Sequence, residues 1–154
     1  MRKAVFKQNK SWAPITLLAG QLIAQATAIL SLFLFNWSPL TLGVALFVYC
    51  SIMLGITMGY HRLFSHKSYQ TNTFVEWVLM IFGSLALENT ILKWSSDHRK
   101  HHSFSETEDD PYSIVKGFWH AHIGWVVKNT SEEKSRIIGV KDLKNKSAII
   151  YETV

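Results

Sequence analysis

The chain has 154 residues, the length of one ordinary domain, and 48% of them are hydrophobic. Because the hydrophobic residues are concentrated in the first 92 positions, we expect a membrane-embedded part followed by a polar part. The formal net charge of +5 does not indicate nucleic-acid binding, since the basic residues are dispersed or mixed with acids and form no basic face with stacking aromatics. The one cysteine, Cys50, excludes an intrachain disulfide and a thiolate zinc site, and we expect it to be buried in its apolar run.

The N-terminal arm is basic, with Arg2, Lys3, Lys7 and Lys10 and no acidic residue. Residues 15–35 then form an uncharged run of 21, which is long enough to cross a bilayer. A basic flank of this kind is typical of the cytoplasmic side of a membrane protein. A cleaved signal peptide is the competing interpretation. We favour a transmembrane span, because the run is longer than the apolar part of a signal and no small-residue cleavage site precedes a soluble mature chain.

A second uncharged run of 21 residues occupies positions 40–60 and follows a short turn at 36–39. At about 1.5 Å per residue, each run reaches about 30 Å, which matches the thickness of the hydrocarbon core. Two spans joined by so short a turn predict a tight antiparallel hairpin whose ends return to the same side of the membrane. We therefore expect His61 to emerge on the cytoplasmic side, together with the basic N-terminus.

A third apolar segment, at 73–92, is interrupted by Glu76 and Glu88, which leave an uncharged core of 11 residues. This core is too short to span a bilayer, so we expect a helix that lies at the membrane interface. The region 93–154 then stays in the cytosol, on the same side as His61. Histidines of this region can therefore meet the histidines that follow the second span.

Most of the histidines of this chain fall into two groups. The members of these groups are His61, His66, His98, His101 and His102. The second group occurs in the sequence Asp-His-Arg-Lys-His-His at 97–102, and the spacing i, i+3, i+4 places its three imidazoles on one face of a helix. Because neutral imidazole is a common ligand of transition metals, we interpret the two groups as a metal site. The alternative is a basic surface turn that happens to be rich in histidine.

The spacing of the first group and the number of imidazoles constrain this site. His61 and His66 are rotated by roughly 140° on an ideal α-helix, so we expect the helix to end between them. Five imidazoles exceed the four ligands of a tetrahedral zinc, and no His-Glu-x-x-His arrangement is present. Five imidazole ligands are more consistent with a multi-metal site or an octahedral iron site. Asp97 is our candidate acceptor for the outer N–H of a metal-binding imidazole.

From residue 103 onward the sequence is polar in character, and it is acidic up to the turn signal at Pro111. His120 and His122 lie in an aromatic segment at 117–125. On a strand they share a face and could bind a metal, whereas on a helix they diverge. We favour amphipathic packing of this segment against the membrane surface. The sequence contains no Gly-rich phosphate loop, nucleophile elbow or internal repeat.

Two stretches of the sequence resemble a known family. The segment Gly-Tyr-His-Arg-Leu-Phe-Ser-His at 59–66 resembles the first histidine box of membrane fatty acid desaturases. The segment Trp-Ser-Ser-Asp-His-Arg-Lys-His-His-Ser-Phe-Ser-Glu-Thr at 94–107 resembles the second box and its continuation. The resemblance extends from about residue 12 to about residue 150 and is closest to the acyl-CoA delta-9 (stearoyl-CoA-type) subgroup. The resemblance implies a fold with four membrane spans. For this chain, the hydropathy and the histidine boxes together predict an all-α membrane protein with a transmembrane helical hairpin, an interfacial helix and a cytosolic helical histidine-box region.

The activity that this resemblance implies is the removal of two hydrogens from a fatty acyl chain to form a cis double bond. The reaction uses O₂, two electrons from an external donor such as cytochrome b5 or ferredoxin, and a di-iron centre. The substrate is a fatty acyl-CoA or an acyl lipid, and the enzyme is integral to the bacterial inner membrane or the endoplasmic reticulum. The implied iron ligands are His61, His66, His98, His101 and His102.

The resemblance also assigns residues outside the ligand set. Asn89, Trp94 and Asp97 match positions near the acyl chain or its CoA end. Ser96 departs from an arginine that often occurs there, and His122 matches a family histidine that is not a ligand.

The sequence also departs from the family by what it does not contain. The family's second span pair and third histidine box are not present within the 154 residues. We therefore expect this chain by itself to be a truncated, inactive portion of a desaturase. A histidine-box membrane hydroxylase, which shares the metal chemistry, and a non-catalytic membrane protein that binds metal are the alternatives.

Overall fold

The computed structural model describes residues 13–128 and 137–143, and this part of the chain is helical and contains no strand. The all-α fold predicted from the sequence is therefore confirmed. The elements in chain order are α1 (Ala13–Leu34), α2 (Pro39–Leu54), η1 (Gly55–Ser65), α3 (Thr73–Ser84), α4 (Ile91–Phe104), η2 (Ile114–Lys116), η3 (His120–Gly124) and α5 (Trp125–Lys128).

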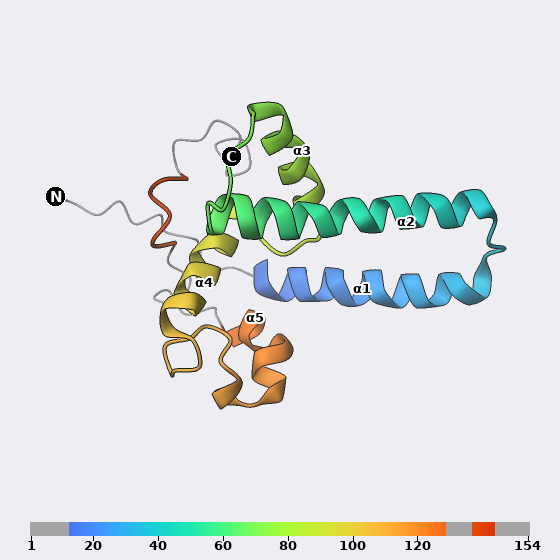
Figure 1. Ribbon diagram of the computed structural model, residues 1–154. Coiled ribbons are helices and arrows are strands. Elements are labelled where there is room, and N and C mark those ends of the chain that lie inside the picture. Colours follow the sequence, from blue (N-terminus) through green and yellow to red (C-terminus); the bar gives the residue numbers. More distant parts are fainter. Residues whose placement is uncertain (1–12, 129–136, 144–154) are drawn as a thin grey trace.

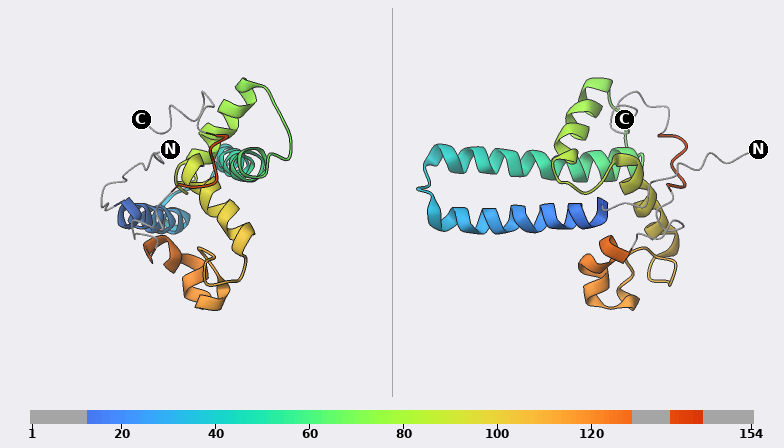
Figure 2. Two further views of the ribbon diagram at one scale, coloured as in Figure 1. Left: turned by 90° about the vertical axis from the view of Figure 1, so that its left-hand side faces the viewer. Right: turned by 180° about the vertical axis from the view of Figure 1, so that it is seen from behind.

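The helices α1 and α2 run antiparallel as a long hairpin that extends away from the rest of the protein (Figures 1 and 2). α2 begins sharply because Pro39 occupies its first turn and the Ser38 hydroxyl accepts the Thr41 amide at 3.1 Å. α2 continues into η1 without a break, and the combined helix Pro39–Ser65, 27 residues long, is apolar enough to cross a membrane. The apolar part of α1, Leu18–Leu34, has 17 residues.

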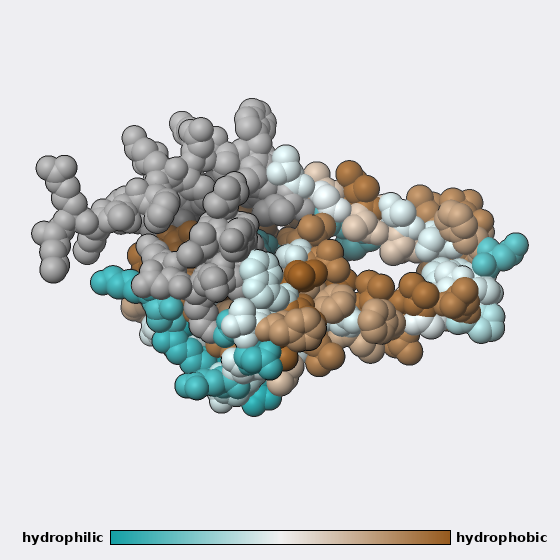
Figure 3. All heavy atoms as spheres, turned by 90° about the horizontal axis from the view of Figure 1, so that it is seen from above, coloured by the Kyte–Doolittle hydropathy of each residue, from teal (hydrophilic) through white to brown (hydrophobic). Residues whose placement is uncertain are grey.

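The surface of this hairpin is apolar along its length (Figure 3). Large side chains such as Phe33, Leu40 and Phe47 are exposed there, as expected for helices whose solvent is lipid rather than water. Cys50 is also exposed, so the prediction that it is buried is wrong. The reason is that α2 projects beyond the packed end of the protein, where no described element covers it.

The second half of the long helix has π-helical hydrogen bonding over eleven residues, Gly55–Ser65. The backbone amide of His66 donates to the carbonyl of His61 at 3.0 Å, five residues earlier. The Ser65 hydroxyl also donates over five residues, to the Tyr60 carbonyl at 2.7 Å. The helix ends at Ser65, between His61 and His66 as expected, and His66 caps it. The sequence did not predict the π-helical widening before this end, and the wider turn brings residues five apart onto one face.

The helix α3 packs across η1 at a pair of glycines. A Cβ atom on Gly55 would lie 2.2 Å from the backbone nitrogen of Gly83, so the two backbones approach more closely than any side chain allows. α3 has 12 residues and ends at Ser84, where a helix reaching residue 92 was expected. The chain turns instead through Leu87 and Asn89, whose positive φ angles of 58° and 85° are incompatible with a continued helix.

The helix α4 begins at a new cap, where the Thr90 hydroxyl accepts the Lys93 amide at 3.3 Å, and it crosses the end of η1. The buried apolar residues of the described chain lie where η1, α3 and α4 meet the segment 137–143. They are Tyr60, Leu63, Phe64, Met80, Ile91, Leu92, Val140 and Leu143. The packed core of the protein thus lies at one end of the hairpin, beside the histidines.

Candidate metal centre

Four histidines from two helices converge on one point. They are His61, His66, His98 and His102, and one ring nitrogen of each lies within 4.8 Å of the others. The Nε2 atom of His66 lies 3.1 Å from that of His61 and 3.0 Å from that of His98, whose Nε2 in turn lies 3.2 Å from that of His102. The first pair comes from the end of η1 and the second from one face of α4, so this four-histidine cluster exists only because the two helices cross.

The three shortest of these nitrogen–nitrogen distances, 3.0, 3.1 and 3.2 Å, are compatible with a common metal ion. Two nitrogens bound at the usual imidazole distance of about 2.1 Å are about 3.0–3.4 Å apart around a tetrahedral or octahedral ion. Metal binding also requires neutral imidazoles. Burial and the neighbouring histidines, His61 first among them, lower the pKa of His98 from 6.5 to about 3, and burial followed by the effect of His61 lowers the pKa of His66 as well. The low pKa values of His66 and His98 favour neutral rings with free lone pairs, and the four-histidine arrangement fits a metal site.

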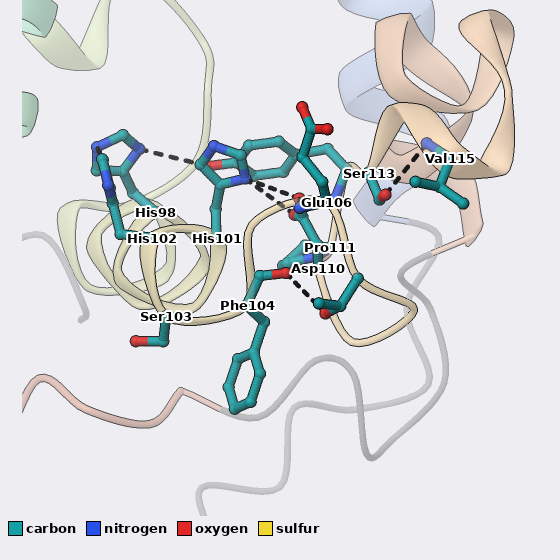
Figure 4. A network of polar contacts seen from close by, with 12 residues as sticks. His98, His101, His102, Ser103, Phe104, Glu106, Asp110, Pro111, Ser113 and Val115 are labelled. Carbon is teal, nitrogen blue, oxygen red and sulfur yellow. Dashed lines mark hydrogen bonds and ion pairs between the residues drawn. The ribbon is translucent and has the colours of Figure 1, made fainter.

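His101 stands apart from the cluster, although it shares the helical face predicted for it (Figure 4). Its Nδ1 atom lies 3.0 Å from both carboxylate oxygens of Asp110. A carboxylate on one imidazole nitrogen fixes the ring and its tautomer, and it leaves Nε2 as the nitrogen available to a ligand. The structure thus brings together four of the five predicted ligands and holds the fifth beside them.

Asp110 is the carboxylate that supports this arrangement. It is almost completely buried and also accepts the backbone amides of Glu106 at 3.0 Å and Tyr112 at 3.1 Å. Burial by itself raises the pKa of Asp110, but the hydrogen bonds from His101 and the two amides outweigh it and lower the pKa. The sequence shows a run of acidic residues after the second histidine group, but it does not indicate which of them contacts His101.

Asp97, the predicted acceptor, does not have this role. Both of its carboxylate oxygens lie 2.6 Å from the ammonium group of Lys93, one helical turn earlier, and both side chains are about nine-tenths buried. Burial raises the pKa of Asp97, while the Lys93 charge acts in the opposite direction. The prediction that Asp97 holds an imidazole is therefore wrong, because its charge is already matched by an internal partner.

His98 is oriented by two aromatic residues. The indole of Trp94 stacks on its ring with centroids 4.7 Å apart, and the Tyr112 hydroxyl lies 3.3 Å from its Nδ1 atom. Tyr112 also stacks on His101 at 4.4 Å. Sequence reasoning did not identify Tyr112, since it lies in a loop ten residues beyond the histidine motif.

The remaining candidate residues lie around this centre. Trp94 donates its indole N–H to Glu88 at 3.0 Å, and Asn89 is exposed in the turn before α4. His120 and His122 lie in the helical element η3 and take no part in the cluster, as expected for the helical alternative. His122 stacks on Phe118 at 5.6 Å.

Curated proteins similar to this chain are acyl-CoA desaturases, whereas no family model matches it. The chain is 40% identical over 111 residues to a probable acyl-CoA desaturase of Schizosaccharomyces pombe, covering 72% of this chain and 23% of the relative. It is 38% identical over 141 residues to stearoyl-CoA desaturase 5 of Homo sapiens, and the match covers 89% of this chain and 42% of the relative. For icosanoyl-CoA 5-desaturase of Limnanthes douglasii the identity is 36% over 151 residues, with 95% and 42% covered. The chain spans less than half the length of these relatives.

Proposed function

Because this chain belongs by its sequence to the acyl-CoA desaturase family, we propose that it forms the histidine-box part of an O₂-dependent oxidoreductase of lipid metabolism. The reaction is the introduction of a cis double bond into a fatty acyl chain. The observation that carries the proposal is the convergence of four imidazole nitrogens within 4.8 Å, at the packed end of an apolar hairpin.

The metal that we propose for this centre is iron. Imidazole donors suit iron, zinc, copper and nickel alike, and of these iron and copper support O₂ chemistry. We propose iron because the histidine motifs resemble those of the di-iron desaturases. The four-histidine cluster holds one ion. His101, fixed by Asp110 at 3.0 Å, presents Nε2 toward a second.

Substrate, partners and membrane placement follow from the same proposal. The substrate is a fatty acyl-CoA or an acyl lipid, and Asn89, Trp94 and Asp97 are its proposed contacts; of these, Trp94 touches the cluster directly through its stack on His98. The electrons come from an external donor such as cytochrome b5 or ferredoxin. The spans are 15–35 and 40–60, within one desaturase domain. The histidines face the cytoplasm because the basic flank precedes the first span.

Metal analysis tests the site. The full chain, purified in detergent micelles after growth with iron, is expected to retain metal through gel filtration. The double variant His98→Ala, His102→Ala is expected to lose it, because two of the four converging nitrogens are removed. His122→Ala is the matched control, since this histidine lies outside the cluster, and it is expected to retain metal. Equal metal content in all three proteins would refute the proposed site.

Product analysis separates the desaturase from the sister hydroxylase. Acyl chains from cells that express the protein are compared by mass spectrometry with those from cells that express the His98→Ala, His102→Ala variant. A new double bond that depends on the two histidines supports a desaturase. A hydroxylated acyl chain without the alkene product supports the hydroxylase. Unaltered lipid is the outcome expected of this chain by itself, both as an inactive portion of a desaturase and as a non-catalytic metal-binding protein.

A further inference from the structure

Arg99 connects the two helices that carry the histidines. It lies on α4 next to His98, yet its guanidinium reaches the last residues of η1, where Nη2 donates to the Phe64 carbonyl at 2.7 Å and Nε donates to the Ser65 carbonyl at 2.8 Å. The last carbonyls of a helix have no intrahelical donor, and a cation is a favourable cap for them. Arg99 therefore caps the end of the helix from which His66 projects.

The same guanidinium also holds a segment far along the chain. Nη1 of Arg99 donates to the Gly139 carbonyl at 2.7 Å, and the two terminal nitrogens bind the two carboxylate oxygens of Asp142 at 2.8 and 3.1 Å. Ser96, one turn earlier on α4, bonds both the amide and the carbonyl of Ile138 at 2.9 Å. With Val140 and Leu143 buried, the segment 137–143 is docked onto α4 and η1.

From these contacts we propose that Arg99 is a positioning residue for the four-histidine cluster, and that Asp142 makes this positioning depend on docking of the segment 137–143. Arg99 touches none of the ring nitrogens. It acts through the Ser65 carbonyl, which belongs to the residue directly before His66. The rigid guanidinium of Arg99, which links α4 to η1, sets how closely the histidine ring nitrogens of the two helices approach. A shift of about 1 Å is enough to disrupt a metal site.

The geometry of the guanidinium is essential to this role. Arg99 makes two separate bonds to η1 and a bidentate bond to Asp142, and only a planar guanidinium with five donors can satisfy all of them at once. A lysine at this position keeps the charge but loses the parallel donors. Asp142 in turn holds the plane of the guanidinium, and Lys67 bonds the same carboxylate at 2.9 Å.

The experiment is a titration of the metal-free full chain in detergent micelles with Co²⁺, followed by the visible absorption of the bound ion. The inference rests on the proposed function, so the unmodified chain is titrated first: no Co²⁺ spectrum there would overturn the proposed site itself. The variants are Arg99→Lys and Asp142→Asn. Lys141→Gln is the matched control, because it changes one charge on the exposed neighbour of Asp142.

We expect Arg99→Lys to weaken Co²⁺ binding about 10-fold or more and to alter the absorption spectrum, as loss of an outer support of a metal site does. Asp142→Asn should weaken binding less, and Lys141→Gln should bind like the unmodified chain. Tryptophan fluorescence and circular dichroism of the metal-free proteins establish that each variant is folded at the titration temperature. If Arg99→Lys does not fold, Asp142→Asn decides alone. Unchanged affinity and spectrum in the folded Arg99 and Asp142 variants would overturn the inference.

Discussion

The Nε2 atoms of His61 and His66 lie 3.1 Å apart, although the two residues are five positions apart in the chain. An α-helix would place these side chains on different faces. The i→i+5 hydrogen bonding of η1 places one above the other and directs both toward His98, whose Nε2 lies 3.0 Å from that of His66. The π-helix η1 is thus the local structure on which one half of the four-histidine cluster depends.

Removal of the Ser65 hydroxyl should loosen this helix. The hydroxyl donates to the Tyr60 carbonyl at 2.7 Å and lies 3.0 Å from the Ser95 hydroxyl on α4. We expect Ser65→Ala to lower the free energy of unfolding of the metal-free protein by about 1–2 kcal/mol, because these polar groups are buried. Chemical unfolding in micelles, followed by tryptophan fluorescence, measures this. Ser103→Ala, which removes an exposed hydroxyl bonded to the Arg99 carbonyl, should change stability by less than about 0.5 kcal/mol.

The close approach of α3 and η1 gives a second prediction. Gly55→Ala places a Cβ atom 2.2 Å from the Gly83 backbone, so the helices must separate, and we expect a loss of about 1–3 kcal/mol. Gly43→Ala on the same long helix meets nothing within 4 Å and should stabilise the helix by about 0.5–1 kcal/mol. Thermal unfolding by circular dichroism compares the two variants. Equal melting temperatures would contradict the packing described for Gly55.

Loss of Asp110 should affect both the loop and His101. Asp110→Ala leaves the amides of Glu106 and Tyr112 without their acceptor and releases the His101 ring, so we expect a loss of stability of about 1–3 kcal/mol. Asp109→Ala is the control. The side chain of Asp109 is adjacent in sequence to Asp110 but is exposed, so this substitution should have little effect. Nuclear magnetic resonance of ¹⁵N-labelled histidine measures the tautomer of His101, which should be mixed in Asp110→Ala and single in the control.

The stability of the metal-free protein should depend on pH through His98. Its pKa falls from 6.5 to about 3 on folding, first because of burial and then because of the neighbouring histidines. As the pH falls, His98 therefore becomes protonated near pH 6.5 in the unfolded chain but only near pH 3 in the folded chain. The contribution of His98 to stability is complete above pH 6.5 and is lost progressively as the pH falls toward 3. Unfolding measured between pH 7.5 and pH 4.5 should show this decline, and it should be smaller in His98→Gln. Parallel curves for the two proteins would contradict it.

Much of the architecture was determined by the sequence itself. The lengths of the two uncharged runs predicted the helices of the hairpin, since a bilayer sets the length of an apolar span. The spacing of His98, His101 and His102 placed them on one helical face, which the structure confirms. The flanks of the histidines also indicated the family to which the similar proteins belong.

The tertiary structure decided which groups meet. Asp97 and Asp110 are both carboxylates close to the histidines in sequence, but the first is matched by Lys93 within α4 and the second folds back through a loop onto His101. The spacing of residues in the sequence specifies which side chains share one face of a helix. The contacts that a side chain makes with other segments depend on the path of the loops and on where two helices cross. The four-histidine cluster is such a crossing: η1 supplies one pair of nitrogens and α4 the other, and Arg99 fastens the two together.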